Sequence, residues 1–232
     1  MSLLSIVADV AARMALPQPP AVIGSTDRQV QQLLALLNEA GSDLLADCNW
    51  QAVRVEQTFV TTATPNQASA LPADFDRFIV NSFFNRSTRR PMTGPITPRQ
   101  WQWIQAQPVY STVYLAFVER SGQFLIAPTP AAGNTIAYEY ISQNWVKSQS
   151  GMPQPTFEAD TDTSFLSEEL LTLSLRWRFK QAKGLDYAED MATFERRKER
   201  LMARDGGATA LTLSPQPIDP NRINIPDGNF GV

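Results

Sequence analysis

Apolar residues recur at steps of three and four in four parts of the chain. This spacing places them on one side of an α-helix, so each part is predicted to form a helix with a buried face. The predicted helices lie near residues 2–15, 26–48, 164–183 and 186–204. The third carries two neighbouring apolar rows, and a helix that is apolar over half its circumference must lie between neighbours.

Three features within these helices bear on their ends and packing. Thr26 with Gln29, and Asp186 with Glu189, have the spacing of capping boxes, so helices are expected to begin there. Gly41 lies on the packed face of the second helix. Glycine in a helix costs about 1 kcal/mol relative to alanine, so its presence indicates a weak point unless another backbone approaches closely there.

Between the two helix pairs the pattern changes to that of β structure. Residues 50–60 are rich in β-branched and aromatic side chains, which is typical of a strand. Thr97 is expected to cap a short helix over residues 99–105. Residues 109–145 alternate around two turns, which predicts an antiparallel meander of three strands with apolar side chains on both faces.

The order helix, helix, β structure, helix, helix indicates an α+β fold. The outer helices must come together to bury their apolar stripes, so the β region is predicted to be an insertion into a helical bundle. The predicted parts are a helical bundle of residues 1–49 and 160–207, a mostly β insertion of residues 50–159, and an extended C-terminal arm of residues 208–232.

The predicted arm has an unusual composition. Residues 209–232 contain four prolines, two glycines and almost no charge, so they are not expected to fold on their own. They are nevertheless more apolar than a solvated linker, which favours binding to a partner by strand addition or by apolar anchors. The candidate anchors are Leu211, Leu213, Ile218, Ile223, Ile225 and Phe230.

Composition excludes several classes of protein. The 232 residues are 43% hydrophobic and 19% charged, as in a soluble globular protein, and no stretch approaches the roughly 20 apolar residues of a membrane span. The start of the chain lacks the basic region of a signal peptide, so synthesis in the cytoplasm is expected. Histidine is absent and Cys48 is the only cysteine, which excludes most hydrolase triads and zinc sites. Cys48 is expected to be a small buried hydrophobic residue.

Two acidic pairs are the candidates for an enzyme, in which carboxylates would bind a metal such as magnesium or act as acid and base. They are Asp160 with Asp162, and Glu168 with Glu169. Both pairs lie at the predicted start of a helix, where acidic side chains also interact favourably with the helix dipole. A carboxylate-based, metal-dependent enzyme is therefore an alternative of low weight.

Basic residues offer a second alternative, a DNA-binding regulatory protein. Arg86, Arg89 and Arg90 form the one concentrated basic cluster outside the helices, and it is either a contact for nucleic acid or an acidic partner, or a polar loop with ion pairs. A helical row adds Arg176, Arg178, Lys180 and Lys183. The net charge of −3 argues against a protein that grips phosphate backbones. The charged run of residues 195–200 is interpreted as a solvated helix face.

Several strings resemble those of head-to-tail adaptor (connector) proteins of tailed bacteriophages, and the general plan is similar to the tail tubular protein A type of short-tailed phages. The strings are LPADFDRF at 71–78, FNRSTRRPM at 84–92, Trp145, AKGLDY at 182–187 and RDGG at 204–207. The resemblance spans roughly residues 25 to 210. It rests on structural strings and not on a catalytic signature.

The resemblance implies a structural virion protein at the neck, between head and tail, with no cofactor. It implies a homo-oligomeric ring, typically of twelve copies, with the portal protein above and a tail tube or nozzle protein below, and with DNA passing through a central channel without specific binding. The helical part would face the portal and the β part would offer a platform to the tail. The arm anchors named above would contact the portal, and Arg86, Arg89 and Arg90 would form interface ion pairs.

Overall fold

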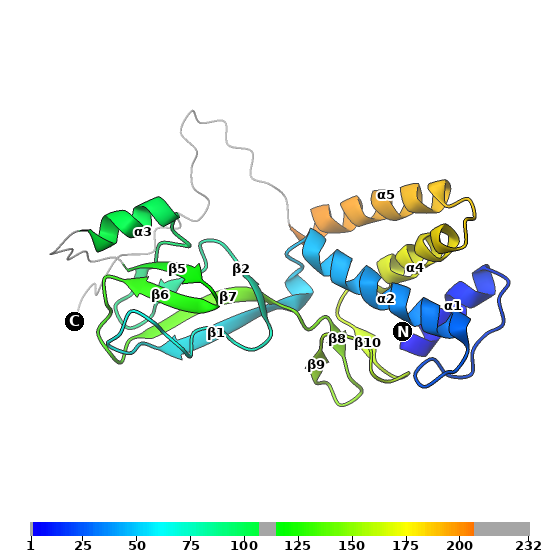
Figure 1. The fold of residues 1–232 in the computed structure, drawn as a ribbon, viewed down its shortest axis with the longest axis horizontal. Coiled ribbons are helices and arrows are strands. Elements are labelled where there is room, and N and C mark those ends of the chain that lie inside the picture. Colours follow the sequence, from blue (N-terminus) through cyan, green and yellow to red (C-terminus); the bar gives the residue numbers. More distant parts are fainter. Residues whose placement is uncertain (1, 107–114, 207–232) are drawn as a thin grey trace. The chain divides into compact units, whose positions relative to one another are not determined.

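The computed structural model describes residues 2–106 and 115–206, which divide into two compact units (Figure 1). The first unit contains residues 2–54 and 142–206, and the second contains residues 55–141. Residues 142–159, which the sequence pattern assigns to the β insertion, belong to the first unit. The mixture of helices and antiparallel sheets confirms the α+β class.

Helices dominate the first unit. Its elements are α1 (Leu3–Arg13), α2 (Arg28–Asp47), the short 3-10 helix η1 (Gln51–Val53), β8 (Val146–Lys147), β9 (Pro153–Gln154), β10 (Thr163–Ser164), α4 (Glu168–Ala182) and α5 (Ala188–Asp205). The three short strands form one antiparallel sheet in the order β10-β8-β9. Among the described helices, none is both long enough and apolar enough to cross a membrane.

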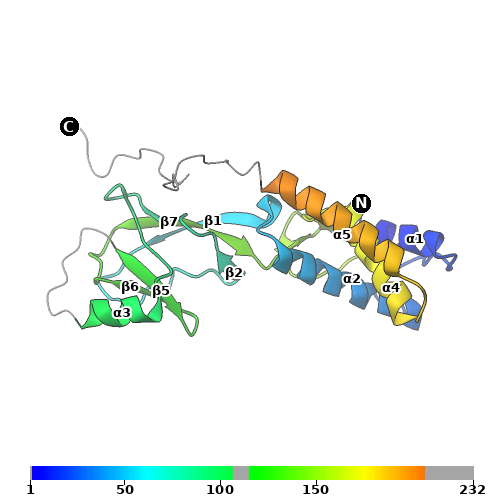
Figure 2. The same ribbon diagram turned by 90° about the horizontal axis from the view of Figure 1, so that it is seen from above.

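Helix α4 is the centre of the first unit, since it contacts α1, α2 and α5 (Figure 2). The prediction of neighbours on several sides of this helix is therefore confirmed. Its buried residues are Leu170, Leu171, Ser174, Leu175 and Phe179. These side chains span about half of the circumference of α4, and contacts with all three helices cover them.

The helix boundaries differ from the predicted ones for local reasons. Helix α2 begins at Arg28, because the Asp27 carboxylate and not Thr26 accepts the Gln29 N–H, at 2.8 Å. Helix α4 begins four residues late, because Thr163–Ser164 pairs with β8 as a strand. Helix α5 begins at Ala188, whose N–H donates to the Asp186 carboxylate at 3.2 Å. Helix α1 ends at residue 13 and not 15.

Gly41 of α2 lies against the indole ring of Trp145. A β-carbon at this position would lie only 2.2 Å from two ring carbons. The close neighbour is an aromatic ring and not a backbone, which was the one exception that the sequence allowed to a weak point at Gly41. Trp145 is itself fully buried, with the ring of Phe157 at 5.2 Å in an edge-to-face contact.

The second unit contains a sheet, a hairpin and one helix. Its elements are β1 (Arg54–Val60), β2 (Phe75–Phe78), β3 (Phe84–Asn85), β4 (Arg90–Pro91), α3 (Pro98–Gln105), β5 (Ala116–Arg120), β6 (Gln123–Ala127) and β7 (Thr135–Ser142). The sheet has the order β1-β7-β3-β4, and β2 also pairs with β7. The predicted three-stranded meander is wrong: β5 and β6 form a hairpin of their own, whereas β7 joins the larger sheet.

The β5–β6 hairpin is covered on both faces, as its two apolar faces predicted. One face adds Phe117, Phe124 and Ile126 to an aromatic core. The other face packs Val118 and Ala127 against Trp101 of α3. Helix α3 begins with the predicted cap, in which Thr97 and Gln100 form a reciprocal capping box. The remaining buried members of the aromatic core are Phe59, Ala70, Phe83, Met92, Ile136, Tyr138 and Tyr140.

A buried carboxylate joins α4 to α5. Asp190 pairs with Arg176, and its second oxygen lies 2.6 Å from the ammonium group of Lys180. Burial favours the neutral acid, but hydrogen bonds and charge from Lys180 and Arg176 outweigh it, so the pKa of Asp190 lies below its usual value. The pair therefore stabilises the contact between the two helices while Asp190 is ionised.

The close approach of Trp145 gives the first testable prediction. Gly41→Ala is expected to destabilise the protein by about 1–3 kcal/mol, because overpacking against the ring outweighs the roughly 1 kcal/mol that alanine gains in a helix. Urea unfolding measures the change, with Ser42→Ala on the exposed side of the same helix as control. Equal stability of the two variants would show that the ring does not restrict position 41.

The Asp190 pair gives a prediction that depends on pH. Asp190→Asn is expected to lower the free energy of unfolding by about 1–3 kcal/mol at pH 7, because two cations lose a partly buried partner. Because the pKa of Asp190 is lowered in the folded state, its ionised side chain stabilises the protein fully above the unfolded-state pKa of about 4. This contribution is lost as the pH falls through the folded-state pKa, so the difference in free energy of unfolding between variant and wild type becomes smaller in acid. Urea unfolding at pH 7 and at a pH below the folded-state pKa of Asp190 tests this, with exposed Glu199→Gln as control. A gap independent of pH contradicts the assignment.

Candidate assembly interface

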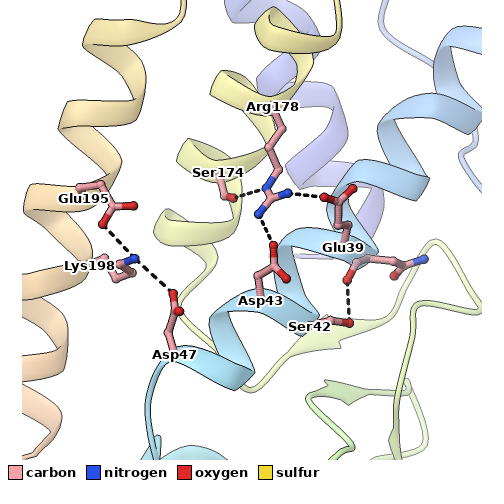
Figure 3. Close-up of polar contacts among 9 residues, drawn as sticks. Glu39, Ser42, Asp43, Asp47, Ser174, Arg178, Glu195 and Lys198 are labelled. Atoms are coloured by element: carbon pink, nitrogen blue, oxygen red, sulfur yellow. Dashed lines mark hydrogen bonds and ion pairs between the residues drawn. The ribbon is translucent and has the colours of Figure 1, made fainter.

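Three carboxylates follow one another along the polar side of α2. Glu39, Asp43 and Asp47 are four residues apart, so they project from one side of the helix as a row (Figure 3). Leu37 and Leu44 on the opposite side are fully buried in the core. We call Glu39, Asp43 and Asp47 the acidic row.

A guanidinium group from α4 lies on the buried side of the first two members of the acidic row. Arg178 donates to Glu39 at 2.5 Å and also to Asp43 (Figure 3). Its Nε donates to the Ser174 hydroxyl at 3.1 Å, which fixes the plane of the guanidinium group. Because one arginine bridges two carboxylates on a neighbouring helix, it sets the positions of both.

An ammonium group from α5 occupies the equivalent place beneath the third member. Lys198 lies 3.2 Å from Asp47 and 2.9 Å from Glu195 of its own helix (Figure 3). Burial favours the neutral amine, but hydrogen bonds to Glu195 and Asp47 outweigh it, so the pKa of Lys198 is raised. Lys198 is therefore charged at neutral pH.

The two signs of charge differ sharply in exposure. The side chains of Arg178 and Lys198 are only 12% and 16% exposed, whereas those of Glu39, Asp43 and Asp47 are 57%, 58% and 42% exposed. The cations are covered and the carboxylates reach solvent. The outside of the acidic row therefore presents negative charge, although each carboxylate has a partner below it.

The helical basic row does not form a surface for phosphate. Arg176 and Lys180 pair with Asp190, and Arg178 lies beneath the acidic row. The ammonium group of Lys183 lies 5.3 Å from the ring centre of Phe179. Three of these four cations are thus neutralised within the unit, which removes the electrostatic basis for gripping DNA there.

The second basic cluster is displayed on the β3–β4 hairpin. Arg86 pairs with Glu56 of β1 at 2.8 Å, and both side chains are about half exposed. Arg89 occupies the turn with a positive φ of 55° and is exposed. Arg90 begins β4 opposite Asn85. The cluster therefore combines a polar loop with an intrachain ion pair, and its role between chains stays a prediction.

The carboxylates proposed for an enzyme serve the backbone. Asp160 accepts the N–H groups of Val22 and Ile23, the latter at 2.8 Å. Asp162 is buried and accepts the N–H groups of Glu158 and Ala159 at 2.9 and 2.8 Å. Within residues 2–106 and 115–206 no group of three metal-ligating side chains comes together. Structural hydrogen bonding accounts for this acidic pair.

The second acidic pair, Glu168 with Glu169, also lies at structural positions. Glu169 pairs with Arg197 of α5 at 2.6 Å, across the contact between α4 and α5. Glu168 is the first residue of α4, as the helix-dipole interpretation expects.

Cys48, expected to be buried, is half-buried at the end of α2, where its backbone is already extended.

The end of α5 is tied to the turn that follows α2. The Asp205 carboxylate accepts the Gln51 N–H at 2.9 Å, and the Gln51 amide donates to the Asp205 carbonyl oxygen at 2.5 Å. A pocket beside these bonds is lined by Trp50, Leu166 and Leu201, among others. The proposed arm anchors between Leu211 and Phe230 lie outside the described residues.

Sequence reasoning overlooked the acidic row. Its signal was present, because three acidic residues at steps of four on the polar side of an amphipathic helix form a continuous stripe. What the spacing does not show is the pair of cations beneath the stripe, since Arg178 and Lys198 lie far away in sequence. The row becomes a distinct surface only when α2, α4 and α5 pack together.

Comparison with known proteins identifies the family. No curated protein matches the chain. The sequence profile of the SU10 adaptor protein family matches residues 1–220, which includes the first helix and the start of the region after α5. The match covers almost all of the sequence and agrees with the resemblance found from residues 71–78, 84–92 and 182–187. The chain therefore belongs to the SU10 adaptor protein family, a family of bacteriophage head-to-tail adaptors.

Proposed function

We propose that the protein is one subunit of an adaptor ring that docks beneath the portal at the neck of the virion and gives the tail a platform. Membership of the SU10 adaptor protein family is the observation that carries the proposal. The division into a helical unit and a β unit supports it, because an adaptor needs separate surfaces for the components above and below. The helical unit would face the portal, and the β unit would face a tail tube or nozzle protein.

A ring of this kind, with about twelve copies, requires two different complementary surfaces on each chain. A head-to-tail contact repeats from copy to copy and closes when the rotation between copies divides a full turn. The charged surfaces of the helical unit are candidates for this contact. The copy number follows from the family resemblance alone.

The charge distribution suits a channel through which DNA slides. Each cationic contact to phosphate adds to affinity by releasing counterions, so a channel wall with many free cations would hold DNA. Here the net charge is −3, and Arg176, Arg178 and Lys180 are paired with carboxylates. DNA would therefore pass without specific binding.

The same contacts favour a structural role over catalysis. Asp160 and Asp162 hold backbone N–H groups, and Glu169 pairs with Arg197. The sequence contains no histidine. We assign the protein an assembly role in the virion, with no cofactor and no reaction.

The proposed arm gives a direct test. Deletion of residues 209–232 is expected to abolish docking on the portal while leaving the helical circular dichroism signal unchanged, because no described helix includes these residues. Light scattering of the chain mixed with purified portal rings measures docking. In a full-length variant, serine replaces Leu211, Leu213, Ile218, Ile223, Ile225 and Phe230 and should have the same effect.

A control for the arm changes its polar positions instead. Thr209, Thr212 and Ser214 replaced by alanine should leave docking intact, because these residues are not among the predicted anchors. Docking by the deleted chain would refute the role of the arm. Loss of the helical signal on deletion would show that the arm belongs to the fold.

The hairpin cluster gives a test of the predicted interface ion pairs. Replacing Arg86, Arg89 and Arg90 by alanine should weaken assembly on the portal about tenfold at low salt, and the effect should shrink as salt screens the charges. The exposed Arg28, Arg99 and Arg120 replaced together by alanine provide a charge-matched control. Equal assembly of both triple variants at every salt concentration would exclude the cluster from an interface.

A further inference from the structure

A second charged row runs along α5. Arg196, Arg200 and Arg204 are exposed and four residues apart, the same spacing as in the acidic row of α2. Arg196 makes only local bonds, to Ala192 and Thr193 of its own helix. Within the part of the chain that the structure describes, none of the three pairs with a carboxylate. We call Arg196, Arg200 and Arg204 the basic row.

The acidic and basic rows cannot join within one copy. Lys198 and Glu195 mark the side of α5 that faces α2, because Lys198 reaches Asp47 there. Arg196 and Arg200 are each two residues from Lys198, and two residues turn a helix by about 200°. The basic row therefore lies on the flank of α5 that is turned away from the acidic row.

We propose that the acidic row of one copy binds the basic row of the next copy. This inference rests on the proposed ring and names the surfaces that make the subunit contact. Residues four apart on a helix are about 6 Å apart along its axis, so two helices side by side can bring three carboxylates opposite three guanidinium groups. Because the rows are different surfaces, the contact repeats from copy to copy, as a ring requires.

The cations beneath the acidic row prepare it for this role. Arg178 and Lys198 hold one side of each carboxylate, so Glu39, Asp43 and Asp47 are already ordered before a partner arrives. Ordered side chains lose less rotamer freedom on binding. Exposed ion pairs are individually weak, so three in register serve mainly to set orientation and partner choice.

Reversal of charge on each row tests the contact. One variant is Arg196→Glu with Arg200→Glu, at exposed positions that form no interhelical bond. The other is Glu39→Lys with Asp47→Lys. It removes the pairs Arg178–Glu39 and Lys198–Asp47, but Arg178 keeps Asp43 as its partner on α2, and Lys198 keeps Glu195 as its partner within α5. Circular dichroism confirms that both variants fold.

Self-association is measured by sedimentation at low and high salt, and loading of portal rings by native mass spectrometry. Wild type should associate with itself in a salt-sensitive way, and each variant alone should associate at least about tenfold more weakly. An equimolar mixture should recover association, because the acidic row of the first variant matches the basic row of the second, and the two reversed rows match each other.

Charge-matched controls separate this contact from net charge. Arg28→Glu with Arg120→Glu, and Glu119→Lys with Glu158→Lys, make the same changes at exposed sites outside both rows. These controls should behave like wild type. Recovery on mixing is the decisive observation. If net charge alone controlled association, each control variant would also associate more weakly by itself, and mixing the two controls would restore association in the same way.

The outcomes distinguish the inference from the proposed function. If wild type does not bind the portal yet associates with itself through the rows, the proposed function fails and the inference stands. If wild type loads onto the portal and both reversed variants load with the same cooperativity, the inference fails and the proposed function stands. A wild-type chain that associates with itself neither in solution nor on the portal also overturns the inference.

Discussion

Helix α4 has buried side chains over about half of its circumference, and the first unit is arranged around the need to cover them. Three helices cover it: α1 and α2, which come from the start of the chain, and α5, which follows α4 after a short turn. The remaining contacts of the unit follow from this packing. The pairing of Asp190 with Arg176 and Lys180 occurs at the contact between α4 and α5.

Packing around α4 also determines where the charges lie. Arg178 of α4 and Lys198 of α5 lie next to α2, and they pair there with Glu39, Asp43 and Asp47. These carboxylates remain exposed to solvent on their outer side. Arg178 and Lys198 are thus covered, and the surface over them presents the carboxylates of the acidic row. The same rule explains why the charged run of residues 195–200 divides between two functions: Arg197 and Lys198 bind neighbouring helices, whereas Arg196 and Arg200 remain on the outer flank.

Periodicity was enough to predict the four long helices and the α+β class, because those signals are local. The Thr97 capping box and the double covering of the β5–β6 hairpin were also readable in the sequence. The errors arose where partners are distant. Strand β10 has only two residues and exists because β8 lies beside it, and β7 leaves its predicted hairpin neighbours to pair with β1 and β3. The acidic row was visible as spacing, but Arg178 lies 139 residues from Glu39.

The two bonds between Gln51 and Asp205 have a mechanical meaning. Asp205 is the last residue of α5, and Gln51 begins the turn that leads directly into β1, so these bonds hold the end of α5 beside the start of that turn. A pull on the residues that follow α5 would load these bonds before it could peel the helix from α4. Because Gln51 also opens the turn into β1, a load on the end of α5 would be shared with the start of β1 through these two bonds.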